Sequence, residues 1–233
     1  MSQEEMKKQA ALKALDEVEN GMKLGLGTGS TARYFVDGLG EKVRAGLEVV
    51  CVPTSEATHA QAESLNIPLA DLGQLKNLDM VVDGADEIDP ALNLVKGGGG
   101  ALLREKIVAA ASGRMVVIAD ETKWVKTLGA FPLPVEVNSF AHEASAAAVG
   151  EVLKATGHSP DLALRLDAGG NVFKTDSGHV IYDCRLREIQ NPAGLAAALL
   201  DIPGVMEHGL FIGMAAKVYL ACRDEIREIE STP

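Results

Sequence analysis

Short apolar runs alternate with amphipathic stretches along the first 130 residues. Residues 3–19 place apolar side chains such as Met6, Ala10 and Leu15 between charged ones, a spacing that predicts an amphipathic helix. Strands rich in Val, Ile and Met that alternate with helices predict a mostly parallel sheet covered by helices on both faces. The predicted strands are MKLGLG, LEVVCVPTS, IPLADLG, LDMVVDGADEID and RMVVIADETK, and the predicted helices begin near Ser30, at EATHAQAESLN and at ALLREKIVAAAS.

The pattern changes near Phe131. A strand-like FPLPVEVN is followed by an alanine-rich helix, LALRL, a hairpin-like NVFKTDSGHVIYDCRL and a second helix, PAGLAAALLDIPG. This β-α-β-β-α-β order predicts a small α+β domain of the ferredoxin-like kind. The tail, GLFIGMAAKVYLACRDEIREIE, is again typical of buried strand. We therefore expect an open Rossmann-like α/β domain over residues 1–130 and 206–233, and a small α+β domain over residues 131–205.

The composition is that of an ordinary globular protein, with 47% hydrophobic residues and a net charge of −11. This charge argues against nucleic acid or an anionic membrane as a partner, because phosphate backbones require a surplus of Lys and Arg. A small anionic ligand is compatible with it, since local donors can hold a phosphate. The N-terminus does not have the pattern of a signal peptide, and no apolar run would span a bilayer, so we expect a cytoplasmic protein. The scattered Cys51, Cys184 and Cys222 are interpreted as small residues in or near a core.

A glycine turn, GLGTGST at residues 25–31, follows the first predicted strand and precedes a helix. Open α/β sheets bind ligands at such turns. A dinucleotide fingerprint fits poorly because Ser30 replaces its third glycine, and no GK[ST] supports a P-loop. The backbone N–H groups and the hydroxyls of Thr28, Ser30 and Thr31 are suited to a phosphate or a sugar. The alternative is a tight turn in which Ser30 or Thr31 caps the helix.

An acidic turn, VVDGADEID, ends another predicted strand with three aspartates and a glutamate between residues 83 and 89. A solvated loop or a divalent-metal site would also explain it, although EF-hand spacing is absent. Asp83 and Asp86 follow a strand at the edge of the sheet where this architecture places its chemistry. Their carboxylates are suited to binding sugar hydroxyls or to moving protons.

Four consecutive glycines stand between a lysine and a predicted helix in KGGGGALLREKIV, residues 96–108. A flexible linker is disfavoured, because the run is short and lies between a buried strand region and a strong helix. Glycines would instead let the backbone approach a ligand closely, beside the helix N-terminus and the charge of Lys96. Glu105 falls about one turn into the helix. By itself it would be interpreted as a surface glutamate in an i,i+4 pair.

Together, GLGTGSTA, VVDGADEID, KGGGGALLREKIV and IADETK resemble the type A ribose-5-phosphate isomerase family along essentially the whole chain. The resemblance implies interconversion of ribose 5-phosphate and ribulose 5-phosphate in the pentose phosphate pathway, without a metal or other cofactor, by a homodimer or homotetramer. It implies that Glu105 is the proton acceptor. The implied substrate-binding residues are Thr28, Gly29, Ser30, Thr31, Asp83, Gly84, Ala85, Asp86, Lys96, Gly97, Gly98, Gly99 and Lys123.

This resemblance leads to a mechanistic expectation. Glu105 would move a proton between C1 and C2 through an enediolate, while Lys96 and the glycine N–H groups stabilise the oxyanion. Asp83 or Asp86 would relay the hydroxyl proton between the two oxygens. The phosphate is expected at residues 28–31 and Lys123, with Lys7 or Lys8 as a possible addition.

Three other functions fit the sequence less well. An amino-sugar-phosphate deaminase would use an extra acid, often a histidine, and the five histidines lie outside the motifs: His59, His142, His158, His179 and His208. A sugar-phosphate sensor would usually carry a basic DNA-binding segment, which this acidic chain does not have. A nicotinamide enzyme is disfavoured by the broken fingerprint.

Overall fold

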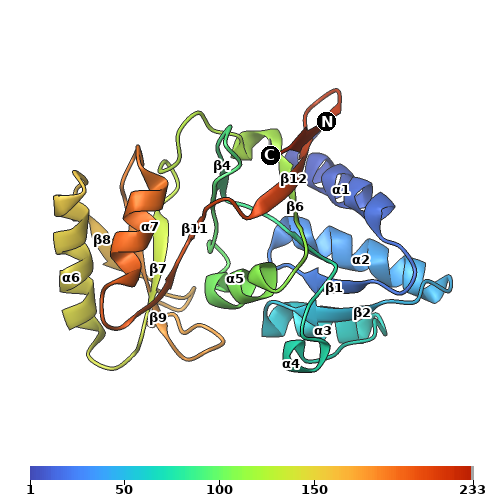
Figure 1. The fold of residues 1–233 in the computed structure, drawn as a ribbon, viewed down its shortest axis with the longest axis horizontal. Coiled ribbons are helices and arrows are strands. Elements are labelled where there is room, and N and C mark those ends of the chain that lie inside the picture. The colour runs from blue at the N-terminus through green and yellow to red at the C-terminus, as the bar shows by residue number, and fades with distance from the viewer. Residues whose placement is uncertain (232–233) are drawn as a thin grey trace. The chain divides into compact units, whose positions relative to one another are not determined.

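The computed structural model describes residues 1–231 and divides into two compact units (Figure 1). Unit 1 comprises Met1–Ala85, Arg104–Trp124 and the chain from Gly213 onward, and unit 2 comprises Asp86–Leu103 and Val125–Ile212. The domain limits expected from the sequence, at residues 131 and 206, stay a prediction.

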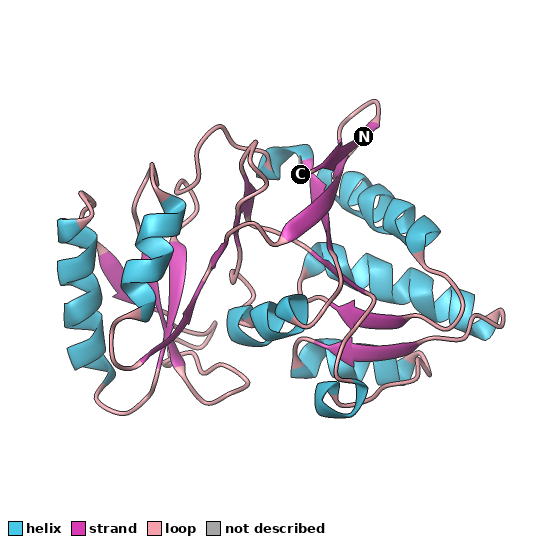
Figure 2. Cartoon of the chain, viewed as in Figure 1, coloured by secondary structure: helices cyan, strands magenta, loops and turns pink. Residues whose placement is uncertain are grey.

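Unit 1 is built on a six-stranded sheet in the order β13-β12-β6-β3-β1-β2 (Figures 1 and 2). All neighbours pair in parallel except β13, which lies antiparallel to β12 at one edge. The expected mostly parallel sheet is therefore confirmed, and the tail of the chain joins it as two strands. The strands are β1 (Lys23–Leu26), β2 (Val50–Pro53), β3 (Met80–Asp83), β6 (Met115–Asp120), β12 (Ala215–Ala221) and β13 (Ile226–Glu230).

Two helices of unit 1 begin where the sequence provides side-chain caps. Ser2 and Glu5 form a capping box at the start of α1, each side chain accepting from the backbone of the other, and Ser55 accepts from Thr58 N–H at the start of α3. The predicted N-terminal helix ends earlier than expected and continues as a 3-10 turn, Leu15–Glu17. The helices are α1 (Gln3–Ala14), α2 (Ser30–Arg44), α3 (Glu56–Ser64), α4 (Leu72–Leu75) and α5 (Leu102–Ala110).

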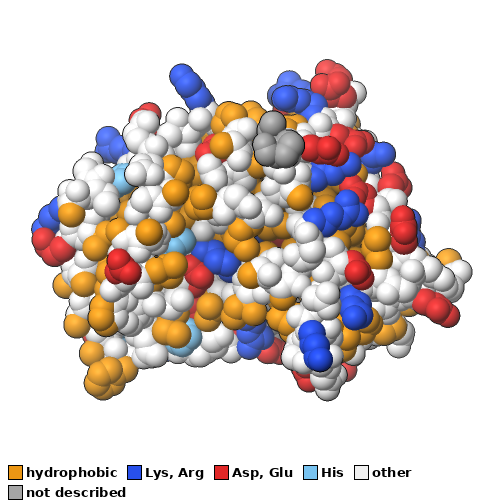
Figure 3. Space-filling model, in the orientation of Figure 1, with side chains coloured by type: hydrophobic (Ala, Val, Ile, Leu, Met, Phe, Trp, Pro, Cys, Tyr) orange, Lys and Arg blue, Asp and Glu red, His pale blue; other side chains and the backbone are white. Residues whose placement is uncertain are grey.

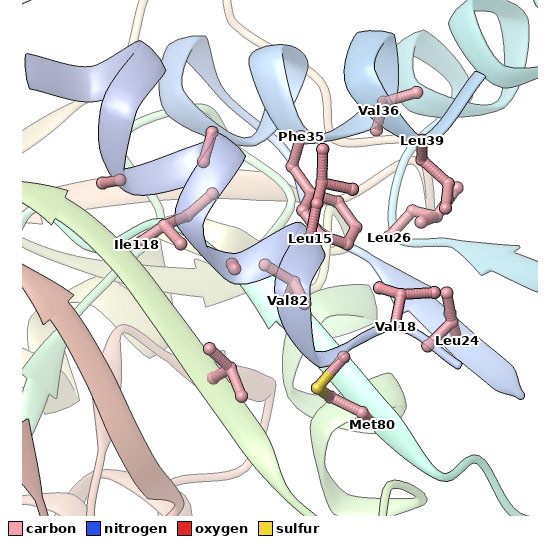
Figure 4. Packing of buried hydrophobic residues seen from close by; sticks show 14 of the residues in the cluster. Leu15, Val18, Leu24, Leu26, Phe35, Val36, Leu39, Met80, Val82 and Ile118 are labelled. Atoms are coloured by element: carbon pink, nitrogen blue, oxygen red, sulfur yellow. The ribbon is translucent and has the colours of Figure 1, made fainter. Parts of the chain in front are cut away.

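Alternate residues of β1 face opposite layers of unit 1, as the pleat of a strand requires. Leu24 and Leu26 are buried in a cluster that includes Leu15 and, on α2, Phe35 (Figure 4). Gly25 faces the other layer, where a Cβ atom would lie 2.6 Å from Cγ1 of Val108 on α5. Helices therefore cover both faces of the sheet, as predicted. Each fully buried leucine contributes about 1.5–3 kcal/mol to stability relative to an exposed one.

Unit 2 contains a four-stranded antiparallel sheet in the order β10-β7-β9-β8, with two helices. Its elements follow the β-α-β-β-α-β order, so the ferredoxin-like prediction is confirmed. Its core joins side chains of the sheet, such as Val135 and Tyr182, to Leu153 of α6 and Leu199 of α7. The elements are β7 (Leu133–Val137), α6 (His142–Ala155), β8 (Leu162–Leu164), β9 (Val180–Cys184), α7 (Pro192–Leu200) and β10 (Val205–His208).

A second, three-stranded sheet of unit 2 was not predicted. It has the order β11-β5-β4, and its strands are Glu87–Ile88 (β4), Leu94–Val95 (β5) and Leu210–Phe211 (β11). Strands of two residues carry no readable alternation, which explains why the sequence pattern missed them. This sheet fixes the ends of the segment between Asp86 and Lys96.

Two predicted strands were wrong. Within IPLADLG, only Leu69 forms an isolated bridge to Cys51, since Pro68 has no N–H to donate and a helical turn, α4, follows. The first arm of the predicted hairpin, residues 171–175, is not a strand. Its N–H groups bond locally instead, that of Phe173 to Arg165 O (3.0 Å) and that of Thr175 to His179 O (3.0 Å).

Within the described part of the chain, none of the helices combines the length and apolar character that crossing a membrane requires. On the face drawn in Figure 3, Lys and Arg side chains are interspersed with Asp and Glu and do not form a continuous basic surface.

Candidate active site

The glycine turn after β1 and Asp83 at the end of β3 form one hydrogen-bonded group in unit 1. Asp83 is 1% exposed, and its Oδ1 accepts from the N–H groups of Thr28 (3.1 Å) and Gly84 (2.7 Å). A Cβ atom at Gly27 would lie 2.2 Å from that oxygen, so a side chain is sterically excluded. The structure thus brings together two of the segments that the sequence predicted to bind substrate.

The N-terminus of α2 presents backbone donors. Its N-cap is Gly29, with φ of 115° and no side-chain cap, so the alternative in which Ser30 or Thr31 caps the helix is wrong. No acidic residue lies in the first turn. Ser30 is exposed and Thr31 half-buried. A long helix that begins without a side-chain cap provides N–H groups suited to an anion.

The hydroxyl of Thr28 points into a cluster of other hydroxyls. Its Oγ1 lies 2.7 Å from Thr54 Oγ1, 2.8 Å from Ser55 Oγ and 3.2 Å from Thr58 Oγ1. Those three residues are buried. The cluster ties the glycine turn to the turn between β2 and α3, so Thr28 rigidifies the site from within. This cluster was not predicted, although the hydroxyl-rich segment PTSEAT carries a signal for it.

Lys123 ends a 3-10 turn, Glu121–Lys123, at the carboxyl end of β6. The turn begins at Asp120, whose side chain accepts from Thr122 N–H (3.1 Å). Gln3 Nε2 lies 3.4 Å from Thr122 Oγ1, which places the start of α1 beside this turn.

Lys7 and Lys8 differ in their surroundings on α1. Lys7 pairs with Glu4 at 2.7 Å and is mostly covered, whereas Lys8 is exposed. Glu4 also accepts from the Tyr34 hydroxyl (2.8 Å), which connects Lys7 to α2. Lys7 is thus held in place by its neighbours, whereas Lys8 is directed to solvent.

Glu105 is the fourth residue of α5 and only 3% exposed. Its interpretation as an ordinary surface glutamate is therefore wrong. Its neighbour Arg104 takes the outward position and pairs with Glu56 at 2.7 Å. Side chains one residue apart on a helix project about 100° apart, which separates these two roles. A carboxylate in the first turn also lies in the favourable field of the helix N-terminus.

Asp86 and the glycine run form a second group, in unit 2. The N–H of Gly98 donates to Asp86 Oδ2 at 2.8 Å, and the N–H of Asp86 donates to Val95 O at 2.8 Å. Gly97 and Gly100 have positive φ, 106° and 80°, and Gly100 N–H donates back to Gly97 O (3.0 Å). The run is thus an ordered turn and not a linker.

Lys96 is 2% exposed, which is rare for a lysine. Its N–H donates to Gly209 O (2.8 Å), and its Nζ lies 5.4 Å from the centroid of the Phe211 ring. Because a buried ammonium is costly, its position inside unit 2 indicates a functional role.

The other two acids of the acidic turn are structural. Glu87 accepts from the N–H groups of Gly129 and Phe131, both at 2.6 Å, and Asp89 accepts from Asn93 N–H (2.9 Å). The four acids of the motif thus divide into two with structural roles, Asp83 in the hydrogen-bonded group of unit 1, and Asp86 in that of unit 2.

Within residues 1–231, no three His, Cys, Asp or Glu side chains gather as a metal site would require. Four of the described histidines, His142, His158, His179 and His208, take part in hydrogen bonds within unit 2. His142 Nδ1 lies 2.7 Å from the Tyr182 hydroxyl, and His179 Nδ1 lies 2.9 Å from Glu136 Oε1.

A parallel sheet with a glycine turn, a buried aspartate and lysines near its carboxyl ends defines an α/β enzyme that acts on a small anionic metabolite.

Comparison with known proteins identifies the family. The model of the ribose 5-phosphate isomerase A (phosphoriboisomerase A) family matches residues 50–225. The ribose-5-phosphate isomerases A of Rhodopseudomonas palustris strain HaA2 and of Bradyrhizobium diazoefficiens are 59% and 57% identical to the chain. Both matches cover 99% of this chain, and they cover 99% and 97% of the relatives.

Two solved structures have the same fold. The ribose 5-phosphate isomerase of Plasmodium falciparum is 34% identical, with a TM-score of 0.94, over 99% of this chain and 100% of that one. A D-ribose-5-phosphate isomerase in complex with phospho-erythronic acid is 39% identical, with a TM-score of 0.92 and the same coverage. The chain belongs to the ribose 5-phosphate isomerase A family, as its motifs suggested. It is an aldose–ketose isomerase that interconverts ribose 5-phosphate and ribulose 5-phosphate.

Proposed function

We propose that Glu105 is the base of this isomerisation. In open-chain ribose 5-phosphate its carboxylate removes the proton from C2, which leaves an enediolate, and then returns the proton to C1. The hydroxyl proton passes from O2 to O1, and ribulose 5-phosphate results. The observation that carries the proposal is the burial of Glu105 in the first turn of α5, six residues after Gly99.

Lys96 and the N–H groups of the glycine run stabilise the charge that builds on the sugar oxygens. A positioned base contributes roughly 10²–10⁴-fold to the rate, and one oxyanion donor contributes roughly 10²–10³-fold. Neither alone reaches the ~10⁶-fold lower end of enzymatic acceleration, so the reaction requires both.

Asp83 and Asp86 have separate roles in the proposed mechanism. Asp83 Oδ1 already accepts two backbone N–H groups, which fixes its carboxylate as an acceptor for a substrate hydroxyl. Asp86 accepts the N–H of Gly98 through its Oδ2. We assign Asp86 the relay of the hydroxyl proton between O2 and O1, because a relay must accept a proton and release it again.

The phosphate is held by the first turn of α2, together with Lys123 and Lys7. The absence of a side-chain cap at Gly29 and the positive end of the helix support this assignment. The ligand of the solved relative, phospho-erythronic acid, carries a carboxylate that resembles the enediolate oxygens. We expect the same compound to inhibit this enzyme in competition with ribose 5-phosphate.

The variant Glu105→Gln tests the proposed base. It should bind ribose 5-phosphate with a nearly unchanged KM, while kcat falls by roughly two to four orders of magnitude. Glu63→Gln, which changes an exposed glutamate of α3, is the matched control and should retain full activity. A normal kcat in Glu105→Gln would exclude this residue as the base.

We also propose that the enzyme is a homo-oligomer, a dimer or a tetramer. Unit 2 exposes several large apolar side chains, among them Phe140 (87% exposed), Leu200 and Leu166. Exposed apolar groups of this size favour self-association when they gather in one patch. Light scattering on the eluted protein should give the mass of two or four chains, and a mass of one chain at micromolar concentration would contradict the proposal.

A further inference from the structure

Arg165, just after β8, joins three segments of unit 2. Its guanidinium forms a two-pronged pair with Asp183 of β9, in which Nε donates to Oδ2 at 2.9 Å and Nη2 donates to Oδ1. Its Nη1 donates to the carbonyl oxygens of Gly97 (2.8 Å) and Gly98 (3.3 Å). The Arg165 side chain is 13% exposed and the Asp183 side chain 25%. The planar fork of an arginine can serve a carboxylate and a carbonyl at once, which a lysine cannot do.

These contacts set the direction of the neighbouring N–H groups. In a planar trans peptide, C=O and N–H point in opposite directions. Because the carbonyls of Gly97 and Gly98 face the guanidinium, the N–H groups of Gly98 and Gly99 are directed away from it. The first of these N–H groups donates to Asp86. Successive N–H groups directed to one side form a concavity that suits an anion.

Phe173 packs against Gly100, the last glycine of the same run. Its ring lies 5.9 Å from the Arg165 guanidinium carbon, and a Cβ atom on Gly100 would lie 2.4 Å from the ring Cζ. The N–H of Phe173 donates to Arg165 O at 3.0 Å. The segment that leaves β8 therefore packs on the glycine run through two contacts, a polar one from Arg165 and an apolar one from Phe173.

We propose that Arg165, fixed by Asp183, is a positioning residue for the isomerisation. It holds the carbonyls of Gly97 and Gly98 so that the N–H groups of Gly98 and Gly99 point to the side where Asp86 and the sugar oxygens lie. The inference rests on the proposed role of the glycine run as an oxyanion donor. Arg165 acts through the backbone and does not itself contact the substrate.

Another arginine of the same sheet provides a matched control. Arg185 pairs with Asp161 through one contact of 3.4 Å, and their side chains are 61% and 52% exposed. Such an exposed pair contributes little to stability. Arg165→Ala and Arg185→Ala remove the same side chain from opposite ends of the antiparallel pair β8 and β9, but only the first releases the glycine run.

The experiment compares steady-state kinetics of the wild type, Arg165→Ala, Arg165→Lys and Arg185→Ala. In Arg165→Ala we expect kcat to fall by about 10- to 100-fold, with KM changed by less than about threefold, since a misplaced donor acts mainly on the transition state. Arg165→Lys keeps the positive charge but not the two-pronged guanidinium. This variant should therefore fold, and its kcat should fall nearly as far as that of Arg165→Ala. Guanidinium ion at non-denaturing concentrations should restore part of the kcat of Arg165→Ala, whereas sodium at equal ionic strength should not. Arg185→Ala should match the wild type.

Two outcomes would overturn the inference. The first is a kcat in both Arg165 variants equal to that of Arg185→Ala. The second is a fall in kcat that merely follows the loss of folded protein, with full activity per folded molecule. An inactive wild type would instead contradict the assigned isomerase activity, so the two failures can be told apart.

Discussion

Asp83 and Gly27 lie so close together that only glycine fits at position 27. A Cβ atom at position 27 would lie 2.2 Å from Asp83 Oδ1 and 2.6 Å from Asp83 Cα. The second of these atoms belongs to the backbone of β3, which cannot turn away as a flexible side chain would. The close approach of the ends of β1 and β3 thus places a buried carboxylate beside the glycine turn.

Gly27→Ala should therefore damage both stability and catalysis. The added methyl group must displace Asp83 or the backbone of β1, and overpacking of this kind costs about 1–3 kcal/mol. We expect a lower melting temperature and a value of kcat/KM at least about tenfold lower, because a small displacement of a positioned group is costly. The control is Gly73→Ala, where a Cβ atom would meet nothing within 4 Å. A wild-type value of kcat/KM in Gly27→Ala would show that the close contact between positions 27 and 83 is not needed for catalysis.

Lys96→Ala tests the buried ammonium. If Lys96 stabilises the enediolate, kcat should fall by roughly 10²–10³-fold with a smaller change in KM. Lys76→Ala, in the loop after α4, provides a control for loss of a lysine outside the site. A variant in which KM rises while kcat is retained would reassign Lys96 to ground-state binding.

The elements that could be predicted from the sequence are those whose burial requires a recognisable run or spacing of apolar residues. Strand β6 is buried at every position from Met115 to Asp120 and is recognised as a near-continuous apolar run. The burial of Glu105 carries no such local signal, because the same helix pattern fits an exposed glutamate. Only the resemblance of the whole motif indicated its role.

Other parts of the site depend on contacts between distant segments. Arg165 and Asp183 are paired across two strands, and Thr28 meets Thr54 from the next strand of the sheet. Tertiary packing decides such contacts, and no spacing along the chain reveals them. The two-residue strands around Lys96 were missed for the opposite reason, since they are too short to show a period.

Low pH should reduce the folding stability of unit 1 through protonation of Glu17. Burial would raise the pKa of this carboxyl, but hydrogen bonds from Tyr219 and Lys217 and the charge of Arg114 outweigh it, so the pKa is lowered. A lowered folded-state pKa contributes stability above the ordinary glutamate pKa of about 4.3, and this contribution is lost as the pH falls through the folded-state value.

Glu17→Gln should therefore reduce stability at pH 7 by roughly 1–3 kcal/mol, the usual contribution of hydrogen bonds to a charged group. The difference from the wild type should shrink as the pH falls below about 4. Urea unfolding at several pH values measures this difference in the free energy of unfolding. Glu19→Gln, which changes an exposed glutamate, is the control. A difference that does not change with pH would contradict the assignment.

The cysteines should react with a thiol reagent in a fixed order. Burial raises the pKa of Cys51 to about 12, and burial with the nearby charges of Asp183 and Asp161 raises the pKa of Cys184 to about 12. Both thiols are buried, whereas Cys222 is only half-buried. At pH 8 the folded protein should therefore expose at most one reactive thiol, and denaturant should release the other two. Cys222→Ser should abolish the reaction of the folded protein, and rapid labelling that persists in this variant would show that the prediction is wrong.

The central claim is that one carboxylate, Glu105, carries the proton between C1 and C2. Exchange of the substrate's carbon-bound hydrogen with deuterated water, followed by NMR, measures this transfer directly. The wild type should introduce deuterium at the transferred position during turnover. Glu105→Gln should lose exchange and isomerisation together, by roughly 10²–10⁴-fold, while it still binds phospho-erythronic acid. Exchange at the wild-type rate in a folded Glu105→Gln enzyme would show that another group removes the proton.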